Sequence, residues 1–147
     1  MAAPSPLAFW ARRQAHETAM HRVDTELAAG LALSPIDAVV AADGVDELLC
    51  GFVPRRSTGL RAAPPTTLRV RSTDAGASWL LQMDGDGVTS TREDEDDAST
   101  AAAAACTVSG EAADLYLALW NRGRQDALSV EGDPAVLAHV LDSVQVR

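Results

Sequence analysis

The feature that most limits the fold is a change in hydrophobic period at Thr66. Apolar or small side chains at positions 68, 70 and 72 alternate with polar ones at 69, 71 and 73, which predicts a half-buried strand. The turn signals Asp74-Ala75-Gly76 and Asp84-Gly85-Asp86-Gly87 separate this strand from two more, Ser78–Met83 and Val88–Arg92. Strands joined by such short turns predict an antiparallel meander.

Helical segments precede the meander. Ser5 and Pro6 form an N-cap and first-turn pair, nothing breaks a helix from Leu7 to about Ala29, and Gly30 is placed to end it. A second helical segment is expected from about Ile36 to Gly51, interrupted at Asp43-Gly44. Its more regular part would be Val45–Phe52, closed by Pro54. Residues 55–65, with one glycine and two prolines, are expected to form a loop.

The second half alternates strand and helix. We expect a strand near Ala103–Val108, a helix over Glu111–Arg122, a short strand at Ala127–Val130 closed by Gly132-Asp133, and a last helix, Ala135–Val144, begun by Pro134. The acidic run 93–97 predicts an exposed loop rather than a metal or partner site. The fold class is therefore α/β in the α+β sense. Residues 34–147 form a two-layer sandwich with a mainly antiparallel sheet, and residues 1–33 form a separate amphipathic helix.

Composition excludes several classes of protein. The 147 residues can bury one good core, and 47% apolar with 22% charged residues is typical of a soluble globular chain. A net charge of −9 argues against nucleic acid or an anionic membrane as partner. We expect neither a signal peptide nor a membrane span, and Cys50 and Cys106 have no metal-type spacing. We therefore expect a cytoplasmic protein with two reduced thiols that are buried and inert.

The candidate metal ligands lie in the first helix. Glu17 and His21 are four residues apart, so they lie about 40° from each other on one helix face. His16 and His21 are five apart, or about 140°, which excludes the zinc-protease helix with histidines at i and i+4. A carboxylate and an imidazole one turn apart can hold the same ion, but two ligands are half a site. A plain surface pair remains the alternative.

Several other side chains have a structural interpretation. We expect His16 to be a packed histidine or a partner contact and His139 to be structural or exposed. We expect Asp24 to pair with an arginine of its own helix, with orientation of a metal ligand as the alternative. Two tryptophans, Trp79 and Trp120, are expected in the core. Arg12, Arg13 and Arg22 are expected to be ordinary helix charges.

The pattern of residues along the chain resembles a known family. The segments concerned are Phe9-Trp10-x-Arg12-Arg13-x-Ala15-His16-Glu17-x-x-x-His21-Arg22-x-Asp24-x-Glu26, then Asp43-Gly44-x-Asp46-Glu47-Leu48, Gly51-Phe52-Val53-Pro54-Arg55, Ala113-Asp114-Leu115-Tyr116-Leu117-x-Leu119-Trp120-x-Arg122 and Val130-Glu131-Gly132-Asp133-Pro134. They resemble, in order, the last bundle helix, the linker and the C-terminal domain of mycothiol-dependent maleylpyruvate isomerases. The resemblance implies a DinB-like metal-binding four-helix bundle followed by an α/β domain similar to sterol carrier proteins.

The resemblance also implies a site. The family's zinc is held by a histidine of an earlier bundle helix and a Glu-x-x-x-His pair of the last one. The pair carries over to Glu17 and His21, and the first histidine has no counterpart because most of the bundle is lacking here. In the family, mycothiol adds to the cis double bond of maleylpyruvate, and rotation and elimination follow. The family's carboxylate-binding arginine corresponds to Arg122, with Arg124 as the alternative.

Two hypotheses about function follow. The chain is a member or truncated relative of this zinc- and mycothiol-using isomerase family, with a small thiol or small acid as ligand and a site completed elsewhere. Alternatively, it is a non-catalytic, sterol-carrier-like binding or interaction module. Under either hypothesis we expect self-association, or association with a partner helix bundle, through the stripe Phe9, Met20, Val23 and Leu27.

Overall fold

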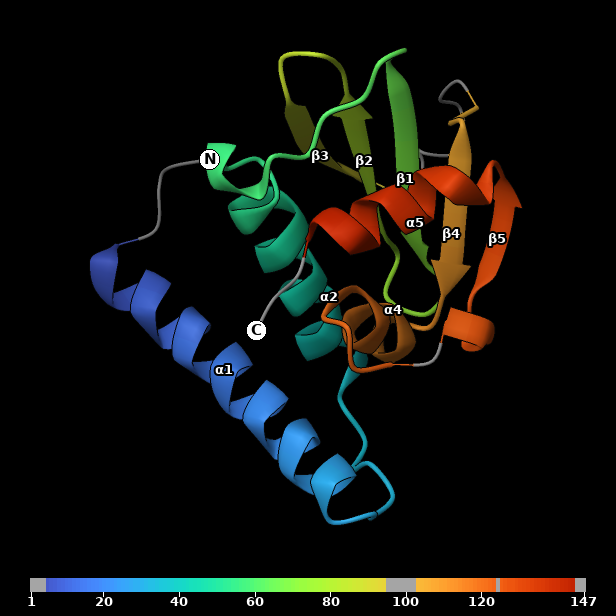
Figure 1. Cartoon of the computed structure of the whole chain (residues 1–147). Coiled ribbons are helices and arrows are strands. Elements are labelled where there is room, and N and C mark those ends of the chain that lie inside the picture. Colours follow the sequence, from blue (N-terminus) through green and yellow to red (C-terminus); the bar gives the residue numbers. More distant parts are fainter. Residues whose placement is uncertain (1–4, 95–102, 124, 145–147) are drawn as a thin grey trace. The chain divides into compact units, whose positions relative to one another are not determined.

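A computed structural model describes residues 5–94, 103–123 and 125–144. The chain divides into two compact units, Met1–Pro35 and Ile36–Arg147 (Figure 1). Among the helices of these described stretches, none has the length and apolar content needed to cross a membrane.

The first unit is a single long helix and the segment that follows it. Helix α1 runs from Pro6 to Ala28, and the Ser5 hydroxyl caps it by accepting a hydrogen bond from the Ala8 amide at 3.2 Å. Gly30 ends the helix with φ of 66°, in the left-handed region that glycine adopts without strain. The predicted start and stop signals of this helix are confirmed.

The second unit contains the sheet and the remaining helices. Its elements in chain order are α2 (Ala38–Asp46), the π-helix η1 (Glu47–Phe52), the 3₁₀ turn η2 (Arg56–Thr58), β1 (Thr66–Ser72), β2 (Ala77–Met83), β3 (Val88–Asp94), β4 (Cys106–Gly110), α4 (Ala112–Leu119), the 3₁₀ turn η3 (Gln125–Ala127), β5 (Ser129–Gly132) and α5 (Pro134–Ser143). The predicted order of helices and strands is confirmed.

The five strands form one sheet in the order β3-β2-β1-β4-β5. The meander β1–β2–β3 is antiparallel as predicted, and β5 is antiparallel to β4. The β1–β4 pair is parallel and places Val70 opposite Val108, while Val70 faces Trp79 on the other side. The sheet is therefore mainly antiparallel, with one parallel pair at its centre.

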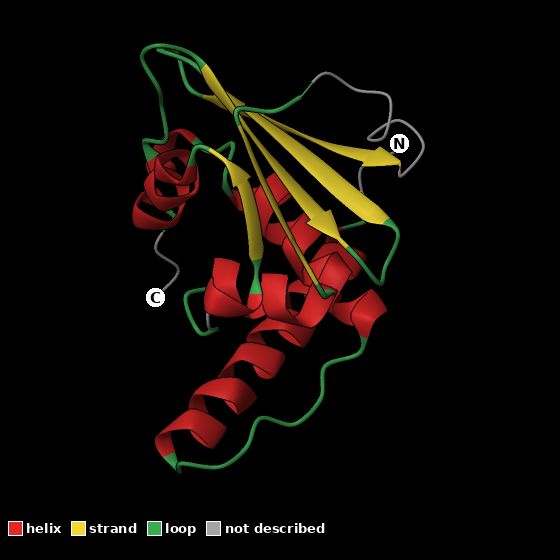
Figure 2. Cartoon of the chain, turned by 90° about the vertical axis from the view of Figure 1, so that its right-hand side faces the viewer, coloured by secondary structure: helices red, strands yellow, loops and turns green. Residues whose placement is uncertain are grey.

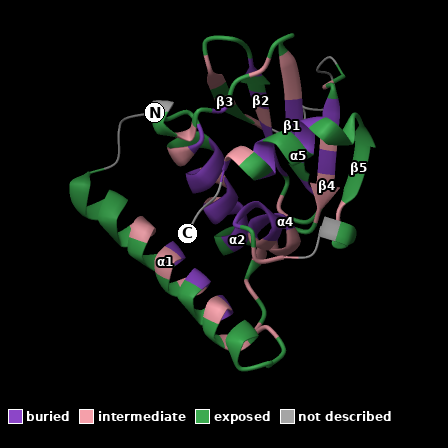
Figure 3. Cartoon of the chain, viewed as in Figure 1, coloured by how far each residue is buried: buried purple, intermediate pink, exposed green. Residues whose placement is uncertain are grey.

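One face of the sheet carries the core. Side chains of the inner strands on this face are almost fully buried: Leu68, Val70, Trp79, Leu81, Cys106 and Val108. Helices α2, α4 and α5 lie on a single side of the strands (Figure 2). Buried positions gather in α2 and the inner strands, whereas β5 is exposed (Figure 3). The two-layer α+β architecture and the core positions of Trp79 and Trp120 are thus confirmed.

The open face holds an ion pair that strict alternation does not predict. Arg69 is only 7% exposed, and its Nε donates to Glu93 Oε2 at 3.2 Å. The pair spans from β1 to β3 across β2. Glu93 is therefore not part of a solvated loop, because β3 continues through it and Arg69 neutralises its charge. Residues 95–97 of the acidic run lie outside the described residues.

Helix α2 corrects another prediction. It runs through Asp43-Gly44 without interruption, and the regular α-helix gives way to a π-helix at Glu47, within the stretch we expected to be more regular. Gly44 is needed for packing, because a Cβ there would overlap the Tyr116 ring of α4. Trp120 adds a hydrogen bond from its Nε1 to the Gly44 carbonyl oxygen at 3.4 Å.

Three element boundaries also differ from expectation. Strand β4 begins at Cys106 rather than Ala103. Helix α4 ends at Leu119, because Asn121 adopts a φ of 62° and the amide of Arg122 turns back to the Leu117 carbonyl oxygen. Strand β5 extends through Gly132, where a side chain would strike the carbonyl oxygen of Ala105.

The β1–β2 turn supplies the cap of α4. Glu111 makes no side-chain cap, and Asp74 Oδ1 instead accepts a hydrogen bond from the Ala112 amide at 2.8 Å. This bond, with a further one from Ser72, lowers the pKa of Asp74 below its ordinary value. The carboxylate thus satisfies a first-turn amide that would otherwise lack a partner.

We expect Gly44→Ala to lower the free energy of unfolding by about 1–3 kcal/mol, since the new methyl group overlaps the Tyr116 ring. Urea unfolding followed by circular dichroism measures the loss. Gly51→Ala is the matched control, because a Cβ at Gly51 would meet no atom within 4 Å apart from its chain neighbours and its own helix backbone. Equal stability of the two variants would contradict the packing role of Gly44.

Asp74→Ala is expected to cost about 1 kcal/mol of stability at neutral pH, the usual value for loss of a helix cap. A lowered folded pKa means that this contribution is present above the ordinary value of 3.8 and is lost as pH falls through the folded pKa. Thermal unfolding of the wild type and the variant, measured from neutral pH to below pH 3.8, tests both the loss of stability and its dependence on pH. Thr73→Ala, which removes only an adjacent exposed side chain, should leave stability unchanged.

Candidate functional site

Helix α1 positions the candidate metal ligands one turn apart, as their spacing predicts. The Glu17 carboxylate is already engaged on its own helix. Its Oε1 pairs with Arg13 Nη2 at 2.9 Å, and its Oε2 accepts a hydrogen bond from Gln14 Nε2 at 2.9 Å. The arginine is therefore not a plain solvent charge, and a metal ion would have to compete with both donors.

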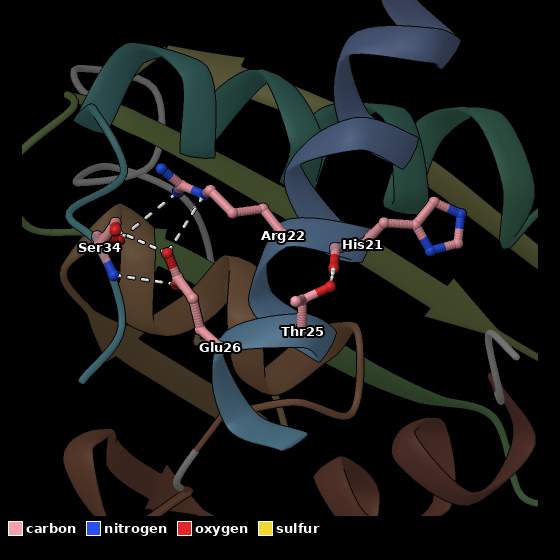
Figure 4. A network of polar contacts seen from close by, with 5 residues as sticks. All are labelled: His21, Arg22, Thr25, Glu26 and Ser34. Atoms are coloured by element: carbon pink, nitrogen blue, oxygen red, sulfur yellow. Dashed lines mark hydrogen bonds and ion pairs between the residues drawn. The ribbon is translucent and has the colours of Figure 1, made fainter. Parts of the chain in front are cut away.

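His21 presents its ring at the surface of α1. The residue is exposed, and its main-chain carbonyl oxygen accepts a hydrogen bond from Thr25 Oγ1 at 2.7 Å. The imidazole points away from the polar network of the neighbouring residues in Figure 4. Its nitrogens are thus presented away from the contacts that hold the end of the helix.

In the described part of the chain, no third metal ligand lies close to Glu17 and His21. No group of three or more histidine, cysteine, aspartate or glutamate side chains suited to a metal ion exists among residues 5–94, 103–123 and 125–144. His16, on the same helix, is 2% exposed, which fits a packed histidine. Glu17 and His21 remain a two-ligand half-site, and their role as ligands stays a prediction.

The end of α1 is held by a separate network. Glu26 accepts hydrogen bonds from the Ser34 amide at 3.0 Å and the Ser34 hydroxyl at 2.6 Å, and Arg22 lies 4.0 Å away (Figure 4). The hydroxyl bond, then the amide bond, lower the pKa of Glu26. This network ties the segment after Gly30 back onto the last turns of the helix that carries His21.

The candidate arginine lies just beyond α4. Arg122 Nη1 donates to the Trp120 carbonyl oxygen at 2.7 Å, so the guanidinium is held against the end of its own helix. Asn121 Nδ2 in turn donates to the Val144 carbonyl oxygen at 3.1 Å, which fixes the turn to the end of α5. Arg124, the alternative, lies outside the described residues.

The two cysteines differ in exposure. Cys106 is buried and Cys50 is exposed, so the expectation of two buried thiols is wrong for Cys50, which lies on η1 at 3.8 Å from Ser90 Oγ. Desolvation by neighbouring atoms, followed by the charge of Asp46, nonetheless raises the pKa of the Cys50 thiol. Desolvation likewise raises the pKa of Cys106. Both groups are protonated at neutral pH and poor nucleophiles.

Among the hollows of the second unit are two that include no predicted site residue. One, of about 580 Å³, is at the end of the sheet near Thr67, Gln82 and Thr89. The other, of about 190 Å³, lies between the 54–61 loop and the 86–88 turn and includes Arg55 and Arg61. Sequence reasoning missed these arginines, although three arginines within residues 55–61 of so acidic a chain were a usable signal.

Comparisons with known proteins place the second unit in a family. The profile of the MDMPI C-terminal domain matches residues 39–139. No functionally curated protein matches the sequence.

Two solved structures of one enzyme share the fold of this chain. The stereoselective inverting sec-alkylsulfatase Pisa1 from Pseudomonas sp. is 14% identical with a TM-score of 0.52, over 70% of this chain and 16% of that one. A double mutant of the same enzyme is 15% identical with a TM-score of 0.52, over 79% and 17%. The UbiJ-SCP2 ubiquinone synthesis protein is 26% identical with a TM-score of 0.43, over 76% and 93%. The chain thus spans about a sixth of the alkylsulfatase's length.

We expect Ser34→Ala to raise the pKa of Glu26 toward its ordinary value of 4.5, because the variant loses the hydroxyl bond that lowers it most. A carbon-detected NMR titration of the Glu26 carboxyl measures the change. In the wild type the network stabilises the helix end above pH 4.5, and this contribution is lost as pH falls through the lower folded pKa. The matched control is Thr25→Ala, which removes a hydroxyl that donates to the His21 carbonyl oxygen, and it should leave the titration unchanged.

Proposed function

We propose that this chain, which belongs to the MDMPI (maleylpyruvate isomerase) C-terminal domain family, supplies two ligands to a zinc-dependent, thiol-using isomerase site. The ligands are Glu17 and His21. The observation that carries the proposal is the position of this pair on a helix that directly precedes a domain matched over residues 39–139. Residues 1–33 would then be the last helix of a DinB-like bundle and residues 34–147 its C-terminal partner domain.

The chemistry of the donor pair supports zinc. Carboxylate oxygen and imidazole nitrogen are both common zinc ligands, and catalytic sites use three protein ligands with one open position. The competing bonds from Arg13 and Gln14 are partly exposed, and such pairs contribute only about 0–1 kcal/mol. A metal ion with a third ligand can therefore displace them. That ligand would come from a second copy, another polypeptide or sequence beyond these residues.

Arg122 is the proposed carboxylate-binding residue. Zinc at the pair would supply a Lewis acid that lowers the pKa of a coordinated thiol such as that of mycothiol. Arg122 has one terminal nitrogen anchored on the Trp120 carbonyl oxygen, which holds its planar fork in a defined orientation. Such a fork binds the carboxylate of a small acid through two parallel hydrogen bonds. The free thiols of Cys50 and Cys106 support a cytoplasmic setting.

The alternative is a non-catalytic, sterol-carrier-like interaction module that associates through α1. Apolar side chains that remain exposed on this helix favour it: Leu7 is 80% exposed, Trp10 60% and Leu27 48%. Phe9 is 39% exposed and packs edge-on against Trp10 with ring centroids 5.5 Å apart. Of the predicted contact stripe, Phe9 and Leu27 are exposed, whereas Met20 and Val23 are buried. Association would bury the exposed part of this surface.

Zinc binding separates the two candidates. We expect Glu17→Ala and His21→Ala each to weaken zinc binding by the whole chain at least tenfold, measured by competition with a chromophoric chelator. Each variant removes one of the two donors on which the site depends. Glu131→Ala, which removes an exposed carboxylate of β5, is the matched control and should bind zinc like the wild type.

Analytical ultracentrifugation of the same samples gives the oligomeric state with and without zinc. A dimer that forms with half a zinc per chain identifies a second copy as the source of the third ligand. Protein that stays metal-free in zinc excess, in monomeric and associated forms alike, would contradict the metal proposal and support the interaction module.

A further inference from the structure

A small hollow beside the sheet concentrates positive charge in an acidic chain. It has a volume of about 190 Å³ and lies between the loop 54–61 and the turn 86–88. Its lining residues include two cationic ones, Arg55 and Arg61, and one anionic one, Asp86. The net charge of these described lining side chains is +1, whereas the whole chain carries −9. The side chain of Arg56 lies outside the described residues.

Arg55 is held in a fixed orientation. Its Nε donates to the Gly51 carbonyl oxygen at 2.9 Å, and its guanidinium lies 4.1 Å from the centre of the Phe52 ring. These contacts use the Nε and one face of the group. The terminal amino groups make no ion pair with any residue that the structure describes, so they are available to a ligand in the hollow.

Arg61 is fixed through its main chain instead. His139 of α5 donates from Nε2 to the Arg61 carbonyl oxygen at 2.7 Å, because a carbonyl oxygen can only accept. The next amide, that of Ala62, donates to the Asp84 carbonyl oxygen at 2.9 Å, and the preceding Leu60 is 2% exposed. The Arg61 guanidinium itself has no ion-pair partner within the described part of the chain. His139 therefore has the structural role expected of it.

The nearby acidic turn does not cancel this charge. Asp84 Oδ1 accepts hydrogen bonds from the Asp86 amide at 2.9 Å and the Gly87 amide at 3.0 Å, and this carboxylate is not part of the lining. Within the described lining of this hollow, Asp86 is the acidic residue that faces the two arginines. One further negative charge would balance the described lining.

We propose that this hollow binds the single carboxylate group of a small organic acid, with Arg55 and Arg61 as its two donors. Planar guanidinium forks match a carboxylate in geometry and charge. The volume is below the roughly 300–1,000 Å³ of pockets for larger ligands, and the flanking Pro54 and Val88 suit a short apolar body. The site uses neither Glu17 and His21 nor Arg122, so it stands independently of the zinc proposal.

The test is an NMR titration of the whole chain with acetate, and in parallel with inorganic phosphate. We expect saturable shifts of the Gly59 and Gly87 amides, which line the hollow, with tighter binding of acetate than of phosphate. Arg61→Gln should raise the Kd for acetate at least tenfold, because it removes one of two charged donors. Arg71→Gln, an exposed arginine of β1 outside the hollow, is the matched control and should keep the wild-type Kd.

A second variant tests the positioning of Arg61. His139→Ala keeps both arginines and should raise the Kd several-fold while leaving the amide spectrum of the sheet unchanged. The proposal is overturned if acetate leaves both glycine amides unshifted, if Arg61→Gln binds acetate like the wild type, or if phosphate binds more tightly than acetate.

Discussion

The close contact between α2 and α4 is the constraint on which the second unit depends. Because Gly44 has no side chain, the Tyr116 ring can lie directly against the backbone of α2, and the Trp120 indole can reach the Gly44 carbonyl oxygen. One half-turn further, Asp46 accepts a hydrogen bond from the Trp79 indole of β2 at 3.0 Å. A single helix thus ties the helical layer to the sheet, and its distance from α4 sets the position of both aromatic anchors.

The parts of the fold that follow from local pattern could be predicted. The two-residue period places Val70 and Trp79 on one dry face, so the meander, its turns and its buried face could be read directly. Features set by distant partners could not. Gly44 resembles a helix breaker until Tyr116 is known to pack on it. Arg69 resembles a solvent-facing strand residue until Glu93 is brought across β2 to pair with it.

In the candidate site, too, local pattern predicts some features and distant partners determine the others. Helical spacing brings Glu17 and His21 onto one face, and it places Arg13 equally close to Glu17 from the other side. Spacing cannot tell which of the two neighbours engages the carboxylate, and in the structure it is Arg13. Spacing likewise cannot supply a third ligand from outside the helix. The hollow with Arg55 and Arg61 depends on a loop, a turn and α5 meeting in space, so the segment that contains Arg55 does not by itself predict it. Charge density in an acidic chain was the one local sign of it.

The topology of the sheet has a consequence for how the chain reaches its native state. The meander needs only short-range closures, whereas the parallel pairing of β1 with β4 joins residues 38 positions apart, as between Leu68 and Cys106 (Figure 1). Closing the loop between β1 and β4 lowers the entropy of the chain before the contacts of the ladder form and offset that cost. The meander β1–β2–β3 can therefore form early in folding, and the β1–β4 ladder forms only after β4 has reached the sheet. Before β4 pairs with it, the edge of β1 opposite β2 has unpaired backbone N–H and C=O groups. This stage of folding is therefore the one at which two chains can most easily pair through their strands and aggregate.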